Sequence, residues 1–389
     1  MRRSTTTVAW AVLACACARG DAERYELDGL VVVEDFDEPI CAGTFAYFER
    51  RLSALERATG LPRDPLGLIF HWIYEPDEIP SQCGELAGAC TKGRDLHGQL
   101  WSFSHELVHA HLDRLGTPRV WLTEGMATML AEDLRGEPDP EVTPSDLLRI
   151  DDARGLNYTA AAGFTVYLRD RYGMPQLLDY YAATAGADAD SSVATFRDVF
   201  GDDFSAAEAD YLATGLSVSI GSPDCDVAEV AWSGDRWSHS FALTCDEPTS
   251  IGPQQSLDEP ERSFLWAGVT MTASAGWFAF DLEASGPAWV TIVRCDRPEI
   301  LYLGAEEPQI NAYLDVGRYL VSADAYADEH TSATVTARRL AEAPDLATVH
   351  GAPPPGFVSH LAQATGTTRG VRTAAPPGAA VNPRGAPAR

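Results

Sequence analysis

Two histidines spaced four residues apart, with a glutamate beside the first, form the segment of this chain best suited to chemistry. The segment SHELVH spans residues 104–109 and contains His105, Glu106 and His109. On a helix, residues i and i+4 lie on one face, so both imidazoles can reach one metal ion. Zinc suits them, because it binds neutral imidazole and carboxylate and leaves one position open for a water molecule. Glu106 lies next to that position, where a carboxylate can hold and deprotonate the water.

A zinc ion bound by two histidines needs a third protein ligand. One known arrangement places another histidine six residues after the second one, but position 115 is a leucine. The other arrangement takes a glutamate from a following helix, and the segment WLTEGMA at residues 121–127 supplies Glu124. Gly116 and Pro118 can turn the chain so that the two helices run antiparallel. We therefore predict that Zn²⁺ is bound by His105, His109 and Glu124.

With these two motifs, the chain resembles the gluzincin branch of the zinc metallopeptidases, and within it bacterial families of the peptidase MA-like type that carry HExxH followed by WLxEGxA. The resemblance covers roughly residues 25–216. It implies an α+β zincin-like catalytic domain with a small mixed sheet, an active-site helix and a helical C-terminal subdomain. It also implies that Tyr158, which opens a later helix, stabilises the oxyanion. The family's glycine three residues after that tyrosine is Ala161 in this chain.

The activity that this resemblance implies is hydrolysis of peptide bonds by an exported zinc peptidase of the secreted lipoprotein type, with Glu106 as general base. The substrate is then a peptide or protein that lies extended along an edge strand near residues 89–97. A different class of function is a catalytically silent zinc-binding surface lipoprotein that acts as an adhesion or scaffold module. The presence of Glu106 argues against that alternative, because metal binding alone needs no general base.

Other catalytic classes lack their sequence signatures in this chain. We find no GxSxG elbow of a serine esterase, no phosphate-binding P-loop and no convincing dinucleotide fingerprint. The 389 residues include 29 basic and 57 acidic ones, for a formal net charge of −28. A surface this acidic repels nucleic acid, so we expect no nucleic-acid partner. The oligomeric state cannot be read from the sequence.

The first 18 residues have the composition of an export signal. Arg2 and Arg3 precede a short apolar run at residues 8–14. Residues 12–15 (VLAC) resemble a bacterial lipobox, which would place a lipid on Cys15 and so attach the protein to a membrane. Cys17 is an alternative site for the lipid. Cleavage after Ala18 is the competing outcome. We therefore expect an exported protein, either an outer-membrane or periplasmic lipoprotein or a secreted one.

Six further cysteines follow the export signal, at positions 41, 83, 90, 225, 245 and 295. In an exported protein these are expected to form disulfides. Three lie before residue 100 and three after residue 220, so either one disulfide joins the halves or each half keeps a free thiol. We predict that Cys41 pairs with the C-terminal half, and that Cys83 and Cys90 can close a short loop.

The elements around the motifs follow from hydrophobic periodicity. Strands are expected at 30–34 and 66–73, and the second of them should be buried on both faces. Residues 75–98 are expected to form a loop with a short edge strand. Helices are expected at 41–59, 101–115, 120–134, 160–172, 174–183, 191–200 and 205–216, with a further helix opening at 143–146.

The C-terminal part has a different texture. We expect an export signal at residues 1–18, the peptidase-like domain at 25–220, an all-β sandwich accessory domain at 225–340 and a disordered tail rich in Pro, Gly and Ala at 341–389. Trp232, Trp237 and Trp266 are either sandwich core or contact residues for a partner, and core is favoured because aromatic side chains are mostly buried.

Other polar residues near the motif have open roles. His111 is expected at the surface or behind the metal ligands, His97 in a solvated loop and His71 in the core. The ligand histidines need hydrogen-bond partners of their own. Candidates for that role are Asp113, Thr128 and Glu132.

Overall fold

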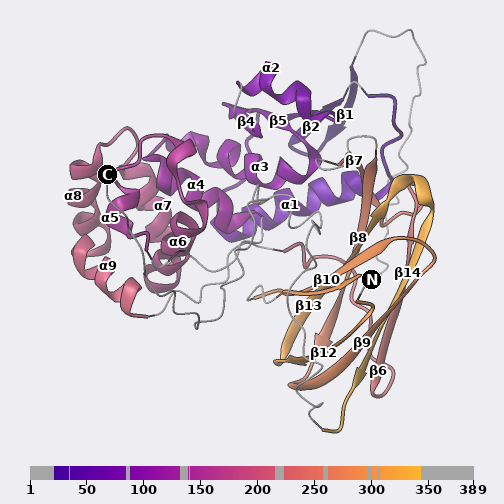
Figure 1. The fold of residues 1–389 in the computed structure, drawn as a ribbon. Coiled ribbons are helices and arrows are strands. Elements are labelled where there is room, and N and C mark those ends of the chain that lie inside the picture. The colour runs from indigo at the N-terminus through magenta and orange to yellow at the C-terminus, as the bar shows by residue number, and fades with distance from the viewer. Residues whose placement is uncertain are drawn as a thin grey trace, which may run out of the picture.

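The computed structural model describes residues 22–34, 36–84, 88–131, 139, 141–214, 223–256, 262–296, 300–304 and 307–342. Within these residues, a part that mixes helices with a small sheet is followed by antiparallel β-sheets, as the ribbon in Figure 1 shows. The predicted succession of an α+β part and a β-sandwich is confirmed at this level. The predicted export signal with Cys15 and Cys17 lies outside the described residues, as do Glu132 and the tail from residue 343. The predicted domain limits stay predictions.

The first sheet has five strands in the order β1-β2-β3-β5-β4. The sheet is mixed. Strand β3 pairs in parallel with both β2 and β5, whereas β1 and β4 run antiparallel to their neighbours. Strand β4 lies at the edge and pairs with β5 alone. The strands are β1 (Glu23–Leu27), β2 (Leu30–Glu34), β3 (Leu68–Trp72), β4 (Ala89–Lys92) and β5 (Asp95–Gly98).

Strand β3 corrects one expectation from the sequence. Its apolar run suggested burial on both faces, but only alternate residues are buried, with Phe70 inside and His71 half-buried on the other face. The buried face packs against the long helix α1, which contributes Phe48 and Leu52 to the same core. Burying such side chains stabilises the fold by about 1.5–3 kcal/mol each.

The helices form most of the rest of this part. Described helices are α1 (Gly43–Thr59), α2 (Ile79–Cys83), α3 (Phe103–Leu112), α4 (Val120–Leu130), α5 (Pro144–Leu147), α6 (Tyr158–Tyr172), α7 (Met174–Ala183), α8 (Ala189–Phe200) and α9 (Phe204–Ala213), with 3₁₀ turns η1 (Pro76–Glu78), η2 (Leu100–Ser102), η3 (Asp113–Leu115) and η4 (Ala153–Gly155). The helix predicted at 120–134 is shorter than expected, because Ala131 leaves the helical conformation with ψ of 170°.

The second part is a sandwich of two antiparallel sheets, with strand orders β11-β10-β13-β8-β7 and β12-β9-β14-β6. Its strands are β6 (Arg236–Leu243), β7 (Ile251–Gln255), β8 (Ser263–Ala273), β9 (Gly276–Ala284), β10 (Ala288–Arg294), β11 (Ile300–Gly304), β12 (Gln309–Leu314), β13 (Gly317–Tyr326) and β14 (Thr331–Arg339), with the turn η5 (Ala327–Glu329) before the last. The facing sides of the sheets enclose a separate apolar core that includes Trp237 and Phe280.

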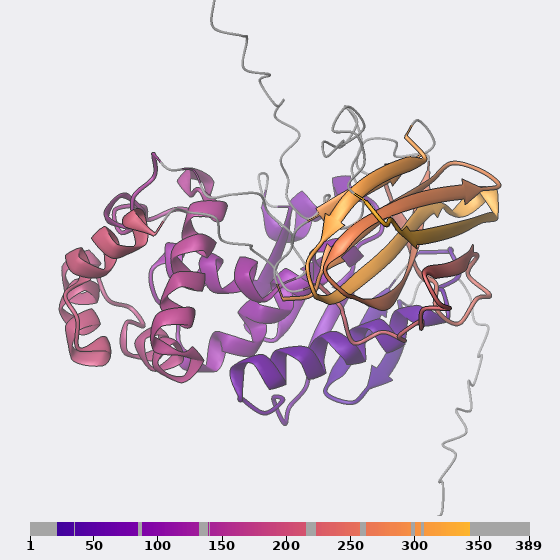
Figure 2. The same ribbon diagram turned by 90° about the horizontal axis from the view of Figure 1, so that it is seen from below.

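The sandwich is joined to the helical part by close contacts along α1. Figures 1 and 2 show the sandwich beside this helix in both views, and β7 is the strand that contacts it. Cys41 forms a disulfide with Cys245 just before the helix begins. A Cβ at Gly43 would lie 2.6 Å from the main-chain oxygen of Ser250, so no larger residue fits without a shift. Trp266 of β8 belongs to the helical core rather than to the sandwich core.

Gln254 carries an extensive polar contact across this junction. Its side chain is buried, and its Oε1 accepts hydrogen bonds from Trp72 Nε1 at 3.0 Å and from the main-chain N–H of Leu100 at 2.6 Å. Its Nε2 donates to the main-chain oxygen of Tyr74 at 3.0 Å. One side chain of the sandwich therefore binds the end of β3 and the turn that leads into α3.

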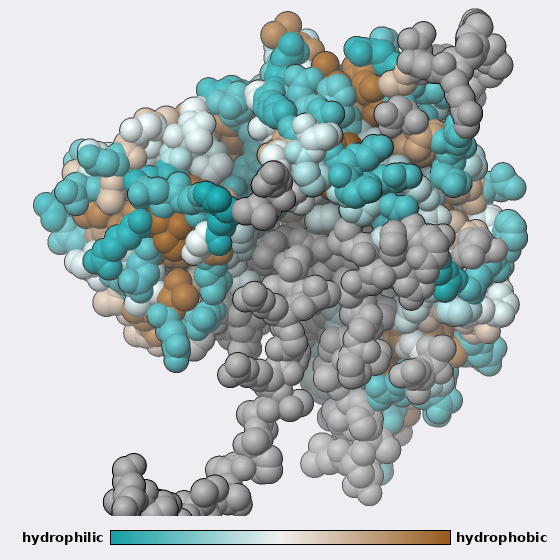
Figure 3. Space-filling view, turned by 45° about the horizontal axis from the view of Figure 1, so that its top comes forward, coloured by the Kyte–Doolittle hydropathy of each residue, from teal (hydrophilic) through white to brown (hydrophobic). Residues whose placement is uncertain are grey.

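The described cysteines form three disulfides, Cys41–Cys245, Cys83–Cys90 and Cys225–Cys295. The predicted link between Cys41 and the C-terminal half is confirmed, as is the short Cys83–Cys90 loop. Such bonds are consistent with an exported protein, because they persist in oxidising compartments. Among the described helices, none combines the length and apolar character needed to span a membrane. Hydrophilic residues cover most of the described surface on the face drawn in Figure 3, with smaller apolar areas.

Candidate metal centre

Helix α3 brings the two histidines of the motif onto one face. The ring centroids of His105 and His109 are 4.8 Å apart, with the rings inclined at 72°. The helix ends at Leu112 and is followed by the turn η3 and by Gly116, whose φ of 88° favours glycine. This turn sends α4 back against α3, as predicted.

Glu124 of α4 completes the group. Its Oε2 lies 3.1 Å from His105 Nε2 and 3.4 Å from His109 Nε2. The three side chains offer ligand atoms that all lie within 4.8 Å of one another. Zinc bonds of about 2.0–2.2 Å in a tetrahedron separate neighbouring ligand atoms by about 3.3–3.6 Å, close to the two distances seen here. The three residues that the sequence predicted as metal ligands therefore lie together at separations that could hold a metal ion.

The electrostatics of this group reflect burial and mutual attraction. Burial raises the pKa of Glu124, but His109 and His105 beside it outweigh that effect and hold the pKa well below its usual range. Burial lowers the pKa of His109, but the Glu124 carboxylate outweighs that effect and raises the pKa to about 9. Without metal, the glutamate is thus ionised and His109 carries a proton at neutral pH.

Glu106 lies on α3 between the two histidines in sequence, and its side chain is buried, with 6% of the residue exposed. The hydroxyl of Thr91, on the edge strand β4, donates a hydrogen bond to Glu106 Oε2 at 2.8 Å and lies 3.1 Å from the main-chain oxygen of the same residue. The sequence did not indicate this partner, because Thr91 stands in a segment that showed only loop and strand signals.

Tyr158 is the first residue of α6, and its ring centroid lies 6.3 Å from that of His105. Asn157 caps the helix by accepting a hydrogen bond from the main-chain N–H of Ala160 at 2.9 Å, which fixes the start of α6 at this point. All five residues that the sequence singled out for the site are therefore on elements that meet around α3.

Gly125 explains why α4 and α6 can approach so closely. A Cβ at this position would lie 2.4 Å from Thr165 Oγ1 and 2.9 Å from the main-chain oxygen of Ala161. The glycine in the WLTEGMA segment is therefore required by packing between the helix that carries Glu124 and the helix that begins with Tyr158.

We predict that Gly125→Ala lowers the free energy of unfolding by about 1–3 kcal/mol, because the added methyl group overpacks this contact. Since Glu124 precedes it, we also expect weaker zinc binding. Urea denaturation and zinc titration measure the two effects. Gly155→Ala is the matched control, because a Cβ there meets only Ile150 Cγ2 at 3.9 Å. Equal stability of both variants with the wild type would contradict the packing role.

Neither of the described residues predicted as hydrogen-bond partners of the ligand histidines is seen in that role. Asp113 is exposed in η3, and the Thr128 hydroxyl is buried without a hydrogen-bond partner in the described part of the chain. Tyr181 of α7, which the sequence did not single out, is buried with its hydroxyl beside Thr123 and in the field of Glu124. Burial raises its pKa to about 12, so the hydroxyl stays protonated.

The other histidines lie away from this group. His111 is buried rather than at the surface, and its Nε2 lies 3.1 Å from Thr59 Oγ1. Burial, reinforced by Arg114, lowers the pKa of His111 to about 4. His71 and His97 stack on each other with centroids 4.4 Å apart on the half-buried face of the sheet, so neither the core nor the loop position predicted for them is correct.

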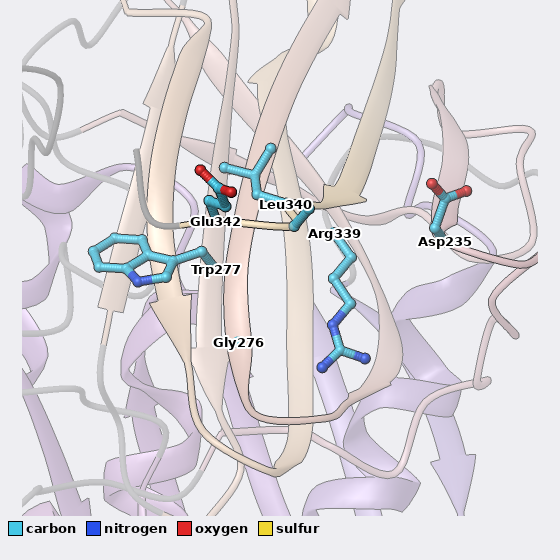
Figure 4. Close-up of a pocket in the computed structure, with 7 residues that line it drawn as sticks. Asp235, Gly276, Trp277, Arg339, Leu340 and Glu342 are labelled. Atoms are coloured by element: carbon cyan, nitrogen blue, oxygen red, sulfur yellow. The ribbon is translucent and has the colours of Figure 1, made fainter. Parts of the chain in front are cut away.

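Of the three tryptophans singled out in the sequence, Trp237 lies in the sandwich core, Trp266 in the helical core, and Trp232 is partly buried against the sandwich core. Trp237 is fully buried, and Trp266 is 4% exposed. Trp232 packs against Phe278 and donates to the main-chain oxygen of Thr272. A hollow of about 460 Å³ lies elsewhere on the sandwich, lined by Asp235, Gly276, Trp277, Arg339, Leu340, Ala341 and Glu342. Figure 4 shows its lining side chains, and none belongs to the histidine–glutamate group.

Comparison with known proteins gives weak likenesses among the solved structures named below. No family model and no curated protein matches the chain. The periplasmic inhibitors of g-type lysozyme from Salmonella Typhimurium and Aeromonas hydrophila are 10% and 11% identical, with a TM-score of 0.19 each, over 28% and 29% of this chain and 97% of theirs. A family two carbohydrate esterase from Cellvibrio japonicus is 14% identical, with a TM-score of 0.14, over 28% of this chain and 37% of its own. At these scores the likenesses carry no argument on fold or function.

Proposed function

We propose that the chain is an exported zinc-dependent peptidase that hydrolyses peptide bonds, with a zincin-like catalytic domain of the gluzincin type. The observation that carries the proposal is the His105–His109–Glu124 group, whose separations suit zinc, beside the buried carboxylate of Glu106. Three protein ligands leave a tetrahedral ion one open position, which is the arrangement of catalytic rather than structural zinc.

Zinc, when bound, acidifies water and polarises a carbonyl group. His105, His109 and Glu124 would hold the ion through two neutral imidazoles and one carboxylate. Glu106 takes a proton from the attacking water and passes it to the leaving amine, as a general base and then a general acid. Tyr158 donates a hydrogen bond to the oxyanion as it develops. The Thr91 hydroxyl donates a hydrogen bond to the buried Glu106 carboxylate, which offsets the cost of burying that charge.

The edge strand β4 supports the proposed mode of substrate binding. Its outer side has no neighbouring strand in the described sheet, and one of its residues contacts Glu106. An extended peptide can pair with such an edge through main-chain hydrogen bonds. A peptide or protein on β4 then lies next to the general base. A lipid on Cys15 or Cys17 would attach the enzyme to a membrane. The three disulfides would be stable in the oxidising surroundings of an exported protein.

Zinc content and cleavage of a peptide library, measured on the purified mature chain, test this proposal. We expect one zinc per chain and cleavage by the wild type. Glu106→Gln should retain zinc and lose about 10²–10⁴-fold in turnover, the usual contribution of general acid–base catalysis. Glu283→Gln, at an exposed position on β9, is the matched control and should be fully active.

Three results would overturn the proposal. Full activity of Glu106→Gln would exclude Glu106 as the general base. Absence of zinc from the purified protein would exclude the proposed zinc site. Zinc without cleavage by the wild type would favour the alternative of a silent zinc-binding surface protein.

A further inference from the structure

We propose that Thr91 positions the carboxylate of the general base, and that the Cys83–Cys90 disulfide holds Thr91 in place, so that turnover depends on the oxidised state of this disulfide. The inference rests on the proposed peptidase function and extends it to control of the same site. It assigns a role to the edge strand beyond substrate binding.

The first step is the contact between Thr91 and Glu106. A threonine hydroxyl has one proton to donate, and here it lies 2.8 Å from Glu106 Oε2. The second carboxylate oxygen is then left for the water and the proton that it gives up. A glutamate side chain has several rotamers, and a hydrogen bond from a different element selects one of them. Thr91 is therefore a positioning residue that acts through Glu106.

The second step is the support of Thr91 itself. Strand β4 has only four residues and pairs on one side with β5. A short edge strand of this kind has few hydrogen bonds to hold it. Cys90 directly precedes Thr91 and is bonded to Cys83 at the end of α2, seven positions earlier. The disulfide thus ties β4 to α2 within one residue of the hydroxyl that contacts Glu106.

The third step is access to the disulfide. Cys83 and Cys90 are both half-buried, so that a small dithiol can reach the bond. A dithiol reductant transfers two electrons and two protons to it, giving two thiols, and is itself oxidised to a disulfide. Once the covalent link is lost, β4 is held by β5 and by weaker contacts with α2 and α3, and the Thr91 hydroxyl is less firmly placed against Glu106.

Thr91→Val in the full mature chain tests the positioning role, because valine keeps the shape and removes the hydroxyl. We expect kcat to fall about 10- to 100-fold, the equivalent of losing a hydrogen bond to a charged group, with KM and zinc affinity unchanged. Thr91→Ser should retain activity within about threefold. In a crystal structure of Thr91→Val, the Glu106 carboxylate should leave its position. Thr214→Val, exposed at the end of α9, is the matched control.

The disulfide is tested by Cys83→Ser combined with Cys90→Ser. We expect a fall in kcat similar to that of Thr91→Val, with zinc retained. Adding Thr91→Val to this double variant should cause little further loss, because both changes remove the same support. Reduction of the wild type with dithiothreitol, followed by alkylation of the thiols, removal of both reagents and restoration of zinc, should lower kcat to the level of the double variant. The double variant keeps the other two disulfides and, taken through the same steps, should lose no further activity.

The outcomes separate this inference from the proposed function. No cleavage by the wild type overturns both. Cleavage that Thr91→Val leaves unchanged, or that falls only in proportion to lost zinc, overturns the role of Thr91 while the peptidase assignment stands. Full activity of the cysteine double variant overturns the role of the disulfide. So does a kcat of the variant that combines Thr91→Val with both cysteine changes, if its loss equals the product of the separate losses.

Discussion

Replacing Gln254 by leucine is expected to lower the free energy of unfolding of the whole protein by about 2–5 kcal/mol. Leucine has a similar volume, but it leaves Trp72 Nε1 and the main-chain N–H of Leu100 buried without their acceptor. Each buried donor that loses its partner costs about 1–3 kcal/mol. The Tyr74 oxygen is less affected, because Gln99 Nε2 also donates to it at 3.0 Å.

Urea denaturation followed by tryptophan fluorescence measures this loss. Gln309→Leu is the matched control, because Gln309 is exposed at the start of β12. We expect the control to keep the wild-type midpoint. An equal midpoint for both variants would mean that the junction contributes little. Because Leu100 begins the turn into α3, a large effect would also mean that the sandwich is structurally coupled to the part that carries the His105–His109–Glu124 group, and is not a separable module.

Zinc binding by the metal-free protein is expected to release protons and to strengthen with pH, by about tenfold per pH unit between pH 7 and about pH 9. The reason is that the Glu124 carboxylate raises the pKa of His109 to about 9, whereas zinc binds only the unprotonated imidazole. Above that pH the affinity should level off. Competition with a chromophoric chelator across this range measures the affinity, and calorimetry in buffers of different ionisation enthalpy counts the protons.

The same pair makes the metal-free protein sensitive to pH in a defined direction. The raised pKa of His109 contributes stability that is present below its ordinary value of 6.5 and is lost as the pH rises through about 9. The lowered pKa of Glu124 contributes stability that is present above 4.5 and is lost in acid. The ion pair therefore stabilises the metal-free fold most between about pH 4.5 and 6.5.

Glu124→Gln separates these effects. Without the carboxylate, the main cause of the raised His109 pKa is gone and only the weaker effect of Glu106 remains, so most of the rise in affinity above pH 7 should disappear. Zinc should also bind at least about 100-fold more weakly, since loss of even an outer hydrogen-bond partner costs about 10- to 100-fold. A wild-type affinity that does not change between pH 7 and 9, with no proton released, would contradict the charge state inferred for His109.

The sequence predicted the strands and helices well where their apolar residues repeat regularly, and less well where an element ends or turns a face outward. The helices at 43–59 and 174–183 begin and end close to their predicted limits. Helix α4 stops at Leu130, although its apolar residues continue to Ala131. The core position predicted for His71 is wrong, because an apolar run does not say which face of a strand is covered.

The sequence by itself was enough to identify the candidate metal-binding group, because the spacing of His105, His109 and Glu124 encodes local geometry. Histidines four apart share a helix face whatever the rest of the fold does, and a turn after His109 brings a glutamate on the next helix back to them. The odd number of cysteines in each half likewise required either a bond between the halves or free thiols. The sequence predicted a bond from Cys41 to the C-terminal half, and the structure identifies the partner as Cys245.

Only the tertiary structure decided which residues support that set. Thr91 and Glu106 are 15 positions apart, and Leu100 and Gln254 are 154 apart. No periodicity links such positions, because their contact depends on how β4 meets α3 and how β7 meets η2. The same holds for Gly125, whose missing side chain has meaning only against α6. Local spacing determines which groups can share a metal, whereas packing between distant segments determines what holds those groups in place.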